Sequence, residues 1–185
     1  MAKTQITTGR CRLSYVSVFE PKLMPDNKTK KFSVTLLIPK EDVRTLTKIE
    51  DAKEAAIDQF KAKNPAKRLP RELPFTLHDG DGLKDNGDEY GPECRGCMVM
   101  TVTSTESRPP VVVYSDKTPI TEPGEIYSGC FGKAVINLFV YDTAGKIGVT
   151  AGLNGVMKLS DGEPLAGGVI TDADWDEDED DDDII

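Results

Sequence analysis

The feature that most constrains the fold is a strict alternation of side-chain character across residues 133–141. Successive side chains of a β-strand point to opposite faces, so a two-residue period divides this segment into two sets. The first set is aliphatic: Ala134, Ile136, Leu138 and Val140. The second set is mixed: Lys133, Val135, Asn137, Phe139 and Tyr141. We predict a strand with one face in the core and the other open to a ligand, or covered by a helix packed over Phe139 and Tyr141.

Other segments with strand character are residues 6–20, 32–38, 98–103, 111–114 and 147–150. In the first of these, alternation places Leu13, Tyr15, Ser17 and Phe19 on one face. Residues 41–60 instead have apolar side chains at three- and four-residue steps, which predicts an amphipathic helix inserted between strands. Glycine, proline and acidic residues predict a long surface loop at 75–92 and a tight turn at 153–157. The chain is therefore expected to be mainly β with one helix.

Cations gather in two segments rich in turn residues. The connection between the strands at 6–20 and 32–38 should form a hairpin with a cationic tip, and a second basic stretch follows the helix. A groove for single-stranded nucleic acid combines cations for phosphates with aromatic rings on which bases stack. The candidate phosphate contacts are Lys22, Lys28, Lys30, Lys31, Arg68, Arg71 and Lys133. The candidate stacking residues are Tyr15, Phe19, Phe32, Phe139 and Tyr141, although the neighbours of Phe32 on its strand are core-like.

The end of the sequence is strongly acidic. The chain has 32 acidic and 23 basic residues, and ten of the acids lie within 172–183, so the remainder is close to neutral. Such a block repels itself and contains too little apolar surface to fold. We expect a nucleic-acid-binding domain at 1–170 and a disordered tail at 171–185. The tail either serves only solubility or, as a polyanion, competes with nucleic acid for the basic groove.

Two small clusters suggest other chemistry. His78, Asp79 and Asp81 can hold a divalent cation, as a metal-dependent nuclease would require, although Asp-Gly-Asp-Gly is more often a turn. Cys94 and Cys97 have the spacing of a zinc knuckle or a redox pair, with Cys11 and Cys130 as isolated further thiols. Structural free thiols are the favoured interpretation, and no metal, cofactor or catalytic residue is expected. The absence of a membrane-length apolar run or a signal region predicts a cytoplasmic protein.

Several short motifs, taken in order, resemble the bacteriophage single-stranded DNA-binding proteins with an OB-fold. They are Leu77-His-Asp-Gly-Asp81, Arg108-Pro-Pro-Val-Val, Tyr127-Ser-Gly-Cys, the strand to Tyr141-Asp, Leu153-Asn-Gly-Val-Met, Gly162-Glu-Pro-Leu and the acidic terminus. The resemblance covers nearly the whole chain. It implies a five-stranded OB barrel with insertions, and non-enzymatic coating of single-stranded DNA during phage replication or recombination in an infected bacterial host.

The resemblance also implies a tail that contacts replication proteins such as a polymerase, helicase or recombinase. The residues concerned are Asp176, Glu177, Asp178, Glu179, Asp180, Asp181, Asp182, Asp183, Ile184 and Ile185. Tails of several such proteins have an aromatic residue after the acids, whereas here two isoleucines follow them. Self-association and the partner of the tail are left open. The competing hypotheses are the metal-dependent nuclease and an acidic DNA mimic that inhibits a host enzyme, against which the basic hairpin argues.

Overall fold

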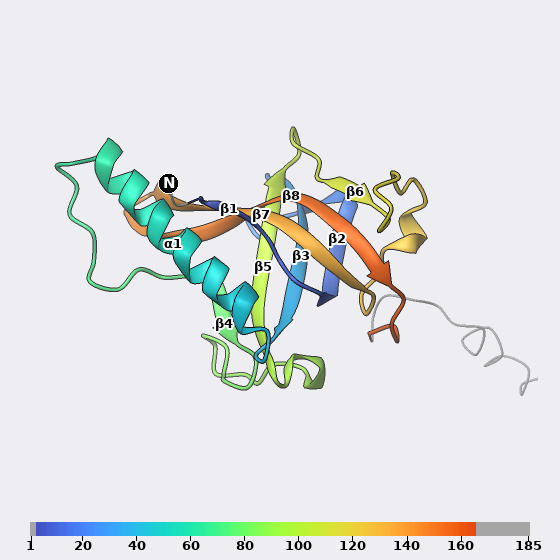
Figure 1. Cartoon of the computed structure of the whole chain (residues 1–185). Coiled ribbons are helices and arrows are strands. Elements are labelled where there is room, and N and C mark those ends of the chain that lie inside the picture. The colour runs from blue at the N-terminus through green and yellow to red at the C-terminus, as the bar shows by residue number, and fades with distance from the viewer. Residues whose placement is uncertain (1–2, 166–185) are drawn as a thin grey trace, which may run out of the picture.

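The computed structural model describes residues 3–165, which form one sheet system and a long helix (Figure 1). The strands are β1 (Gln5–Thr7), β2 (Cys11–Leu23), β3 (Lys30–Pro39), β4 (Leu77–Asp79), β5 (Cys97–Thr105), β6 (Val111–Val113), β7 (Phe131–Thr143) and β8 (Lys146–Ser160). The helix α1 (Val43–Lys63) lies between β3 and β4, and the 3-10 turns η1 (Pro92–Cys94) and η2 (Pro123–Glu125) lie in loops. The expectation of a mainly β chain with an inserted helix is confirmed.

Five of the strands close into a ring in the order β7, β2, β3, β5, β8 and back to β7. Each neighbouring pair is antiparallel except β5 and β8, which run parallel. The pairing of β5 with β8 consists of the single pair Thr103 and Gly152, whereas β7 and β8 are paired along almost their whole length. We call the junction of β5 and β8 the seam. Of the joints in the ring, it has the fewest paired residues.

Strand β7 supplies both the core and the outer surface, as its alternation predicts. Ala134, Ile136 and Leu138 are fully buried and belong to the main hydrophobic cluster. Phe139, on the opposite face, is 44% exposed. The inner face of β7 therefore anchors the barrel, while its outer face remains available.

The helix packs against the barrel with its small and aliphatic side chains. Ile49, Ala52 and Ala56 are buried in the same cluster as the inner face of β7, and Figure 1 shows α1 beside β1 and β7. Asp42 caps the helix by accepting a hydrogen bond from the backbone N–H of Thr45 at 3.1 Å. The helix α1 thus packs with the inner face of β7, and Phe139 stays exposed. The alternative prediction, in which the helix covers the aromatic residues of the outer face, is wrong.

The structure corrects the expected strand boundaries in two places. The first strand is divided into β1 and β2, and β2 contains a bulge between Ser14 and Ser17, with Tyr15 at a φ of 46°. The bulge shifts the alternation of the strand. Leu13 and Val18 therefore both lie in the core, although regular alternation would place them on opposite faces. The turn expected at 153–157 is absent, because β8 continues through it to Ser160.

The Asn154-Gly155 pair that suggested the turn instead lies at an irregularity in the β8 ladder. Val135 pairs with Gly155 and Ile136 with Leu153, so Asn154 is the extra residue of a bulge. The loop expected at 75–92 also contains a short strand, β4, which pairs with β5.

Among residues 3–165, no helix is long and apolar enough to cross a membrane. The proposed division at residue 170, the acidic tail and all of its candidate partner-binding residues lie outside the described residues.

Candidate nucleic-acid interface

A groove of about 350 Å³ lies on the outer surface of the barrel at the seam. Strands β5, β7 and β8 contribute its floor, and the start of β3 and the loop after β5 form its rim. Its lining includes Lys31, Thr103, Thr105, Arg108, Asn137, Phe139, Gly152 and Asn154. The barrel thus joins, in one concave site, residues that are more than a hundred positions apart in the sequence.

Glycines in β8 make room for the aromatic side chains of β7. A Cβ atom added to Gly152 would lie 3.6 Å from Cε1 of Phe139, so the ring lies beside the bare backbone of the neighbouring strand. A Cβ atom on Gly148 would lie 2.5 Å from the hydroxyl oxygen of Tyr141, so this ring also lies against a glycine. Phe139 lines the groove, and Tyr141 follows it on the same outer row. An exposed phenylalanine ring supported by backbone can stack on a nucleobase.

Two cations reach the groove from different elements. Lys31 pairs with Lys22 across the β2–β3 hairpin and with Thr105 on β5. Arg108 lies in the turn after β5, where its backbone N–H donates to the carbonyl of Thr105 at 2.9 Å. Lys31 is among the phosphate contacts predicted from the sequence, whereas Arg108 is named there only within the Arg108-Pro-Pro-Val-Val motif of the family resemblance. The signal that could have identified it is an arginine next to two prolines, in a turn between two strands.

The hairpin tip beside Lys31 has an ordered turn. The Asp26 carboxylate accepts hydrogen bonds from the N–H groups of Lys28 and Thr29, both at 2.9 Å, and from the Thr29 hydroxyl at 2.6 Å. These bonds, chiefly those from Thr29, lower the pKa of Asp26 to about 2. The exposed side chains of Lys22 on β2, Lys28 in the turn and Lys30 on β3 therefore lie at or beside a defined hairpin tip, next to Lys31, which lines the groove.

Other predicted residues lie away from the groove. Lys133 lines an adjoining hollow on the outer face of β7, and Arg71 lines a third hollow with Lys53 and Lys61 beside α1. Arg68 is exposed in the connector that follows α1.

Four predicted stacking residues are also not part of the groove lining, namely Tyr15, Phe19, Phe32 and Tyr141. Tyr15 is 66% exposed at the β2 bulge, and Phe19 is half-buried against the core. Phe32 is 5% exposed. Its burial leaves no ring face on which a base can stack, so the expected role does not fit the structure.

The acidic cluster at Asp79 and Asp81 holds a lysine. The Lys40 ammonium lies 2.6 Å from Asp79 and 2.7 Å from Asp81, and Asp81 also accepts from the backbone N–H of Gly96. The hydrogen bonds from Lys40 lower the pKa of both carboxyl groups and raise that of the lysine. This geometry does not favour the nuclease hypothesis.

All four cysteines are free thiols. Burial raises the pKa of each, which disfavours the thiolate needed for metal binding or redox attack. Across residues 3–165, no three histidine, cysteine or acidic side chains are grouped as metal ligands would be.

The ring order, the parallel seam and the position of the groove define a class of protein. In an OB-fold, a five-stranded barrel binds oligonucleotides or oligosaccharides across the face of its second and third strands and beside two of its loops. Here those strands are β3 and β5, and the β2–β3 hairpin is the first of those loops. The protein is an OB-fold barrel, and its groove extends from Lys31 on β3 and Thr103 on β5 across the seam to Phe139 on β7.

Comparison with known proteins identifies the family. The model of the family described as Enterobacter phage Enc34, ssDNA-binding protein, matches residues 4–185, and the chain belongs to this family. The solved structure of the single-stranded DNA-binding protein from bacteriophage Enc34 in complex with ssDNA is 26% identical, with a TM-score of 0.68 over 88% of this chain and 89% of that one.

Two further proteins are similar over most of their length. Protein p50 of Acyrthosiphon pisum secondary endosymbiont phage 1 is 28% identical over 170 residues, which are 89% of this chain and 88% of that protein. The single-stranded DNA-binding protein gp2.5 of bacteriophage T7 shares the fold, at 21% identity and a TM-score of 0.56 over 92% of this chain and 99% of that one.

Proposed function

We propose that this protein binds single-stranded DNA without strong sequence preference and protects it during phage DNA replication or recombination. The observation that supports this best is the groove at the seam, in which Phe139 lies with Lys31 and Arg108. The solved complex of the Enc34 relative with ssDNA supports the choice of ligand. The protein is proposed to bind DNA without catalysing a reaction. It is proposed to act in the cytoplasm of the infected host cell.

The side chains of the groove suit a ligand of variable sequence. Stacking on an aromatic ring accepts any base, because every base has a π-face, and each stack contributes about 1–3 kcal/mol. Lysine and arginine bind the phosphates, which are the same at every nucleotide. Binding should therefore weaken steeply with salt, since it releases counterions from the strand.

The acidic segment at 172–183 is proposed to compete with DNA for the same cations. Its ten carboxylates resemble a nucleic-acid backbone in charge density, whereas the rest of the chain is close to neutral. When DNA occupies the groove, the segment is released and can recruit a replication protein such as a polymerase, helicase or recombinase. Copies of the protein bound side by side on one strand can also associate with each other.

Fluorescence anisotropy of a labelled single strand tests both parts of this proposal. The full chain and a variant lacking residues 172–185 are titrated at several salt concentrations. We expect salt-sensitive binding by both proteins and tighter binding by the truncated one. Equal or weaker binding by the truncated protein at matched salt would remove the competing role of the tail and leave the binding function intact.

A substitution in the groove locates the binding site. Phe139→Ala should weaken binding about 5- to 150-fold, which corresponds to one lost stack of about 1–3 kcal/mol. The partly exposed ring contributes little to the core, so the thermal midpoint should change little. Tyr15→Ala, at an exposed aromatic residue outside the groove lining, is the matched control. Failure of every form to bind single strands would reject the proposed function and favour the DNA-mimic alternative.

A further inference from the structure

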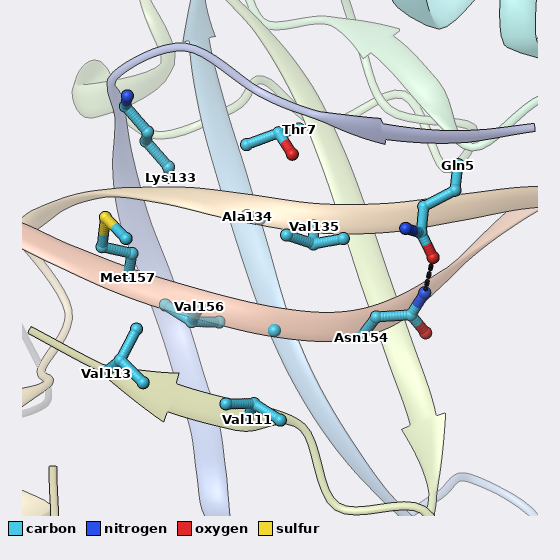
Figure 2. Close-up of a pocket in the computed structure, with 11 residues that line it drawn as sticks. Gln5, Thr7, Val111, Val113, Lys133, Ala134, Val135, Asn154, Val156 and Met157 are labelled. Atoms are coloured by element: carbon cyan, nitrogen blue, oxygen red, sulfur yellow. Dashed lines mark hydrogen bonds between the residues drawn. The ribbon is translucent and has the colours of Figure 1, made fainter. Parts of the chain in front are cut away.

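A second hollow, of about 310 Å³, lies next to the groove on the outer face of β7 and β8 (Figure 2). Strands β1 and β6 flank it on its two sides. The groove and this aliphatic hollow share one lining residue, Asn154. A ligand that runs along the outer face of β7 from Phe139 toward Lys133 therefore passes from the groove into the hollow.

The hollow exists because a glycine occupies the middle of a row of side chains. The strand register places Thr7, Val135, Gly155 and Val111 side by side across β1, β7, β8 and β6. Gly155 has no side chain, so the sheet is indented between Val135 and Val111. The neighbouring row of Lys133, Met157 and Val113 closes one end of the indentation.

The walls of the hollow are almost entirely apolar. Val111 and Val113 form one side, and Val135 and Met157 lie opposite them (Figure 2). Val111 is 64% exposed, so its apolar side chain is open to a ligand. Flat apolar surfaces of this kind suit the faces of a nucleobase, and a thioether such as that of Met157 makes favourable contacts with an aromatic ring.

Polar side chains lie at both ends of the hollow, and Thr7 on β1 adds a hydroxyl group in its middle row. At the end nearer the groove, the Asn154 amide donates to Oε1 of Gln5 at 2.8 Å, and Figure 2 shows the Gln5 amide nitrogen on the side toward Val135. At the other end, the Lys133 side chain extends outward from β7. Among the residues that the structure describes, none that lines the hollow is acidic. The ends thus offer hydrogen bonds for a base edge and a positive charge for a phosphate.

We propose that the aliphatic hollow binds one unpaired base of the same DNA strand that occupies the groove, with Lys133 at the adjoining phosphate. This inference rests on the proposed function and extends it, because it assigns a second base site and a path for the strand. The shared Asn154 provides continuity between the two sites, and the positive charge at the far end matches a polyanion. A volume near 300 Å³ is at the lower end of the range for small-ligand pockets, as a single base requires.

The test compares oligodeoxythymidines of increasing length on the full chain by anisotropy. Val111→Asp places a charge in the hollow without disturbing a buried position, and Val111→Thr changes its polarity with little change of shape. Leu83→Asp is the matched control, because Leu83 is 65% exposed, follows β4 in the chain and belongs to the lining of neither the groove nor the hollow.

We expect Val111→Asp and the Leu83→Asp control to bind the shortest oligomers with equal affinity. Longer strands should bind more tightly, and Val111→Asp should lose about fivefold or more of this gain in affinity. Val111→Thr should lose a smaller part of that gain. Strands containing 5-bromodeoxyuridine should crosslink to β6 or to Met157, as mass spectrometry of the digest would detect. Equal affinities of the Val111→Asp and Leu83→Asp proteins at every length would overturn the proposal.

Other occupants of the hollow give different outcomes, and each contradicts the base site. If the acidic tail were bound there, Val111→Asp would tighten DNA binding at all lengths, and deleting 172–185 would abolish this effect. If a second copy of the chain were bound there, Val111→Asp would change the sedimentation of the DNA-free protein. Absence of binding to any length by any form would instead reject the proposed function, which Phe139→Ala tests independently.

Discussion

At the residue scale, the groove depends on side chains whose roles are set by small neighbours and local hydrogen bonds. Phe139 lies beside the bare backbone of Gly152, and the Asp26 carboxylate orders the turn at the tip of the hairpin. Arg108 is positioned by a turn whose backbone bonds to Thr105. Each cation that contacts a phosphate should therefore contribute separately to the salt dependence of binding.

Arg108→Gln tests this contribution. Loss of one phosphate contact should reduce the slope of log affinity against log salt by about 0.7 for a single strand, because one fewer counterion is released. Arg44→Gln removes the same charge from an exposed position on α1 and should leave the slope unchanged. Anisotropy titrations at four or more salt concentrations measure both slopes. Equal slopes for the two variants would remove Arg108 from the interface.

The cysteines provide a second test at this scale. Burial raises the pKa of Cys11 to about 12, so at pH 8 about one molecule in ten thousand has its thiolate. Cys97 is only partly buried, although burial raises its pKa as well. Iodoacetamide should alkylate Cys97 first in the native protein and all four thiols in denaturant, as mass spectrometry can follow. Native Cys11 reacting as fast as Cys97 would contradict the described burial.

At the scale of elements, α1 is joined to the barrel at its first turn. Asp42 caps Thr45, and the Thr45 hydroxyl accepts from the backbone N–H of Gly9, in the connection between β1 and β2. A Cβ atom at Gly9 would lie 2.5 Å from Oδ2 of Asp42, so a side chain at this position would displace the cap. The start of the helix and the connection between two strands therefore depend on one another.

Removal of the cap tests this connection. Asp42→Ala should lower the free energy of unfolding by about 1 kcal/mol, within the usual range of about 0.5–2, because the N–H of Thr45 loses its acceptor. Asp51→Ala, on the exposed side of the same helix, should change it by less than about 0.5 kcal/mol. Urea unfolding followed by circular dichroism measures both. A negligible effect of Asp42→Ala would show that the cap is not needed to hold the helix.

The sequence predicted elements better than their details, for physical reasons. The alternation in β7 identified Ala134, Ile136 and Leu138 as core, because only a two-sided strand produces such a pattern. The bulge at Tyr15 was invisible, since its positive φ depends on tertiary contacts and not on residue type. Asn154-Gly155 suggested a turn, and only the pairing of β8 with β7 and β6 makes it part of a continuous strand.

The candidate site was predicted in part. Lys31 and Phe139 line the same groove. They are brought together by closure of the barrel, which no local sequence pattern predicts. Arg108 was missed because a loop residue acquires its neighbours only from the fold. Phe32 was included because aromatic residues on strands look alike in a sequence, whether they face the solvent or are buried.

At the scale of the whole molecule, the groove lies on the joint of the ring that has the fewest paired residues. Thr103 and Gly152 form the single pair between β5 and β8, and both line the groove. Local opening should therefore begin at the seam, since a joint with few hydrogen bonds separates at low free energy. A strand bound across the groove contacts both sides of this joint and should hold it closed.

Hydrogen exchange measured by NMR tests this behaviour. Amides of β8 that face β5 should exchange faster than those paired with β7, and bound DNA should slow them selectively. The amides of β7 that pair with β8 serve as an internal reference in the same sample. Uniform exchange along β8, or uniform slowing by DNA, would contradict a seam that opens independently.

Strand β7 has a consequence for changes of chain length. Its two faces serve the core and the ligand, and they are one residue out of phase, so inserting or deleting one residue would turn Phe139 inward and Leu138 outward. A change of two residues would preserve the faces and slide the aromatic ring about 7 Å along the strand. Insertions and deletions should therefore be tolerated in the hairpin turn at 24–29. Within β7 they should be tolerated only when they preserve which residues face the core.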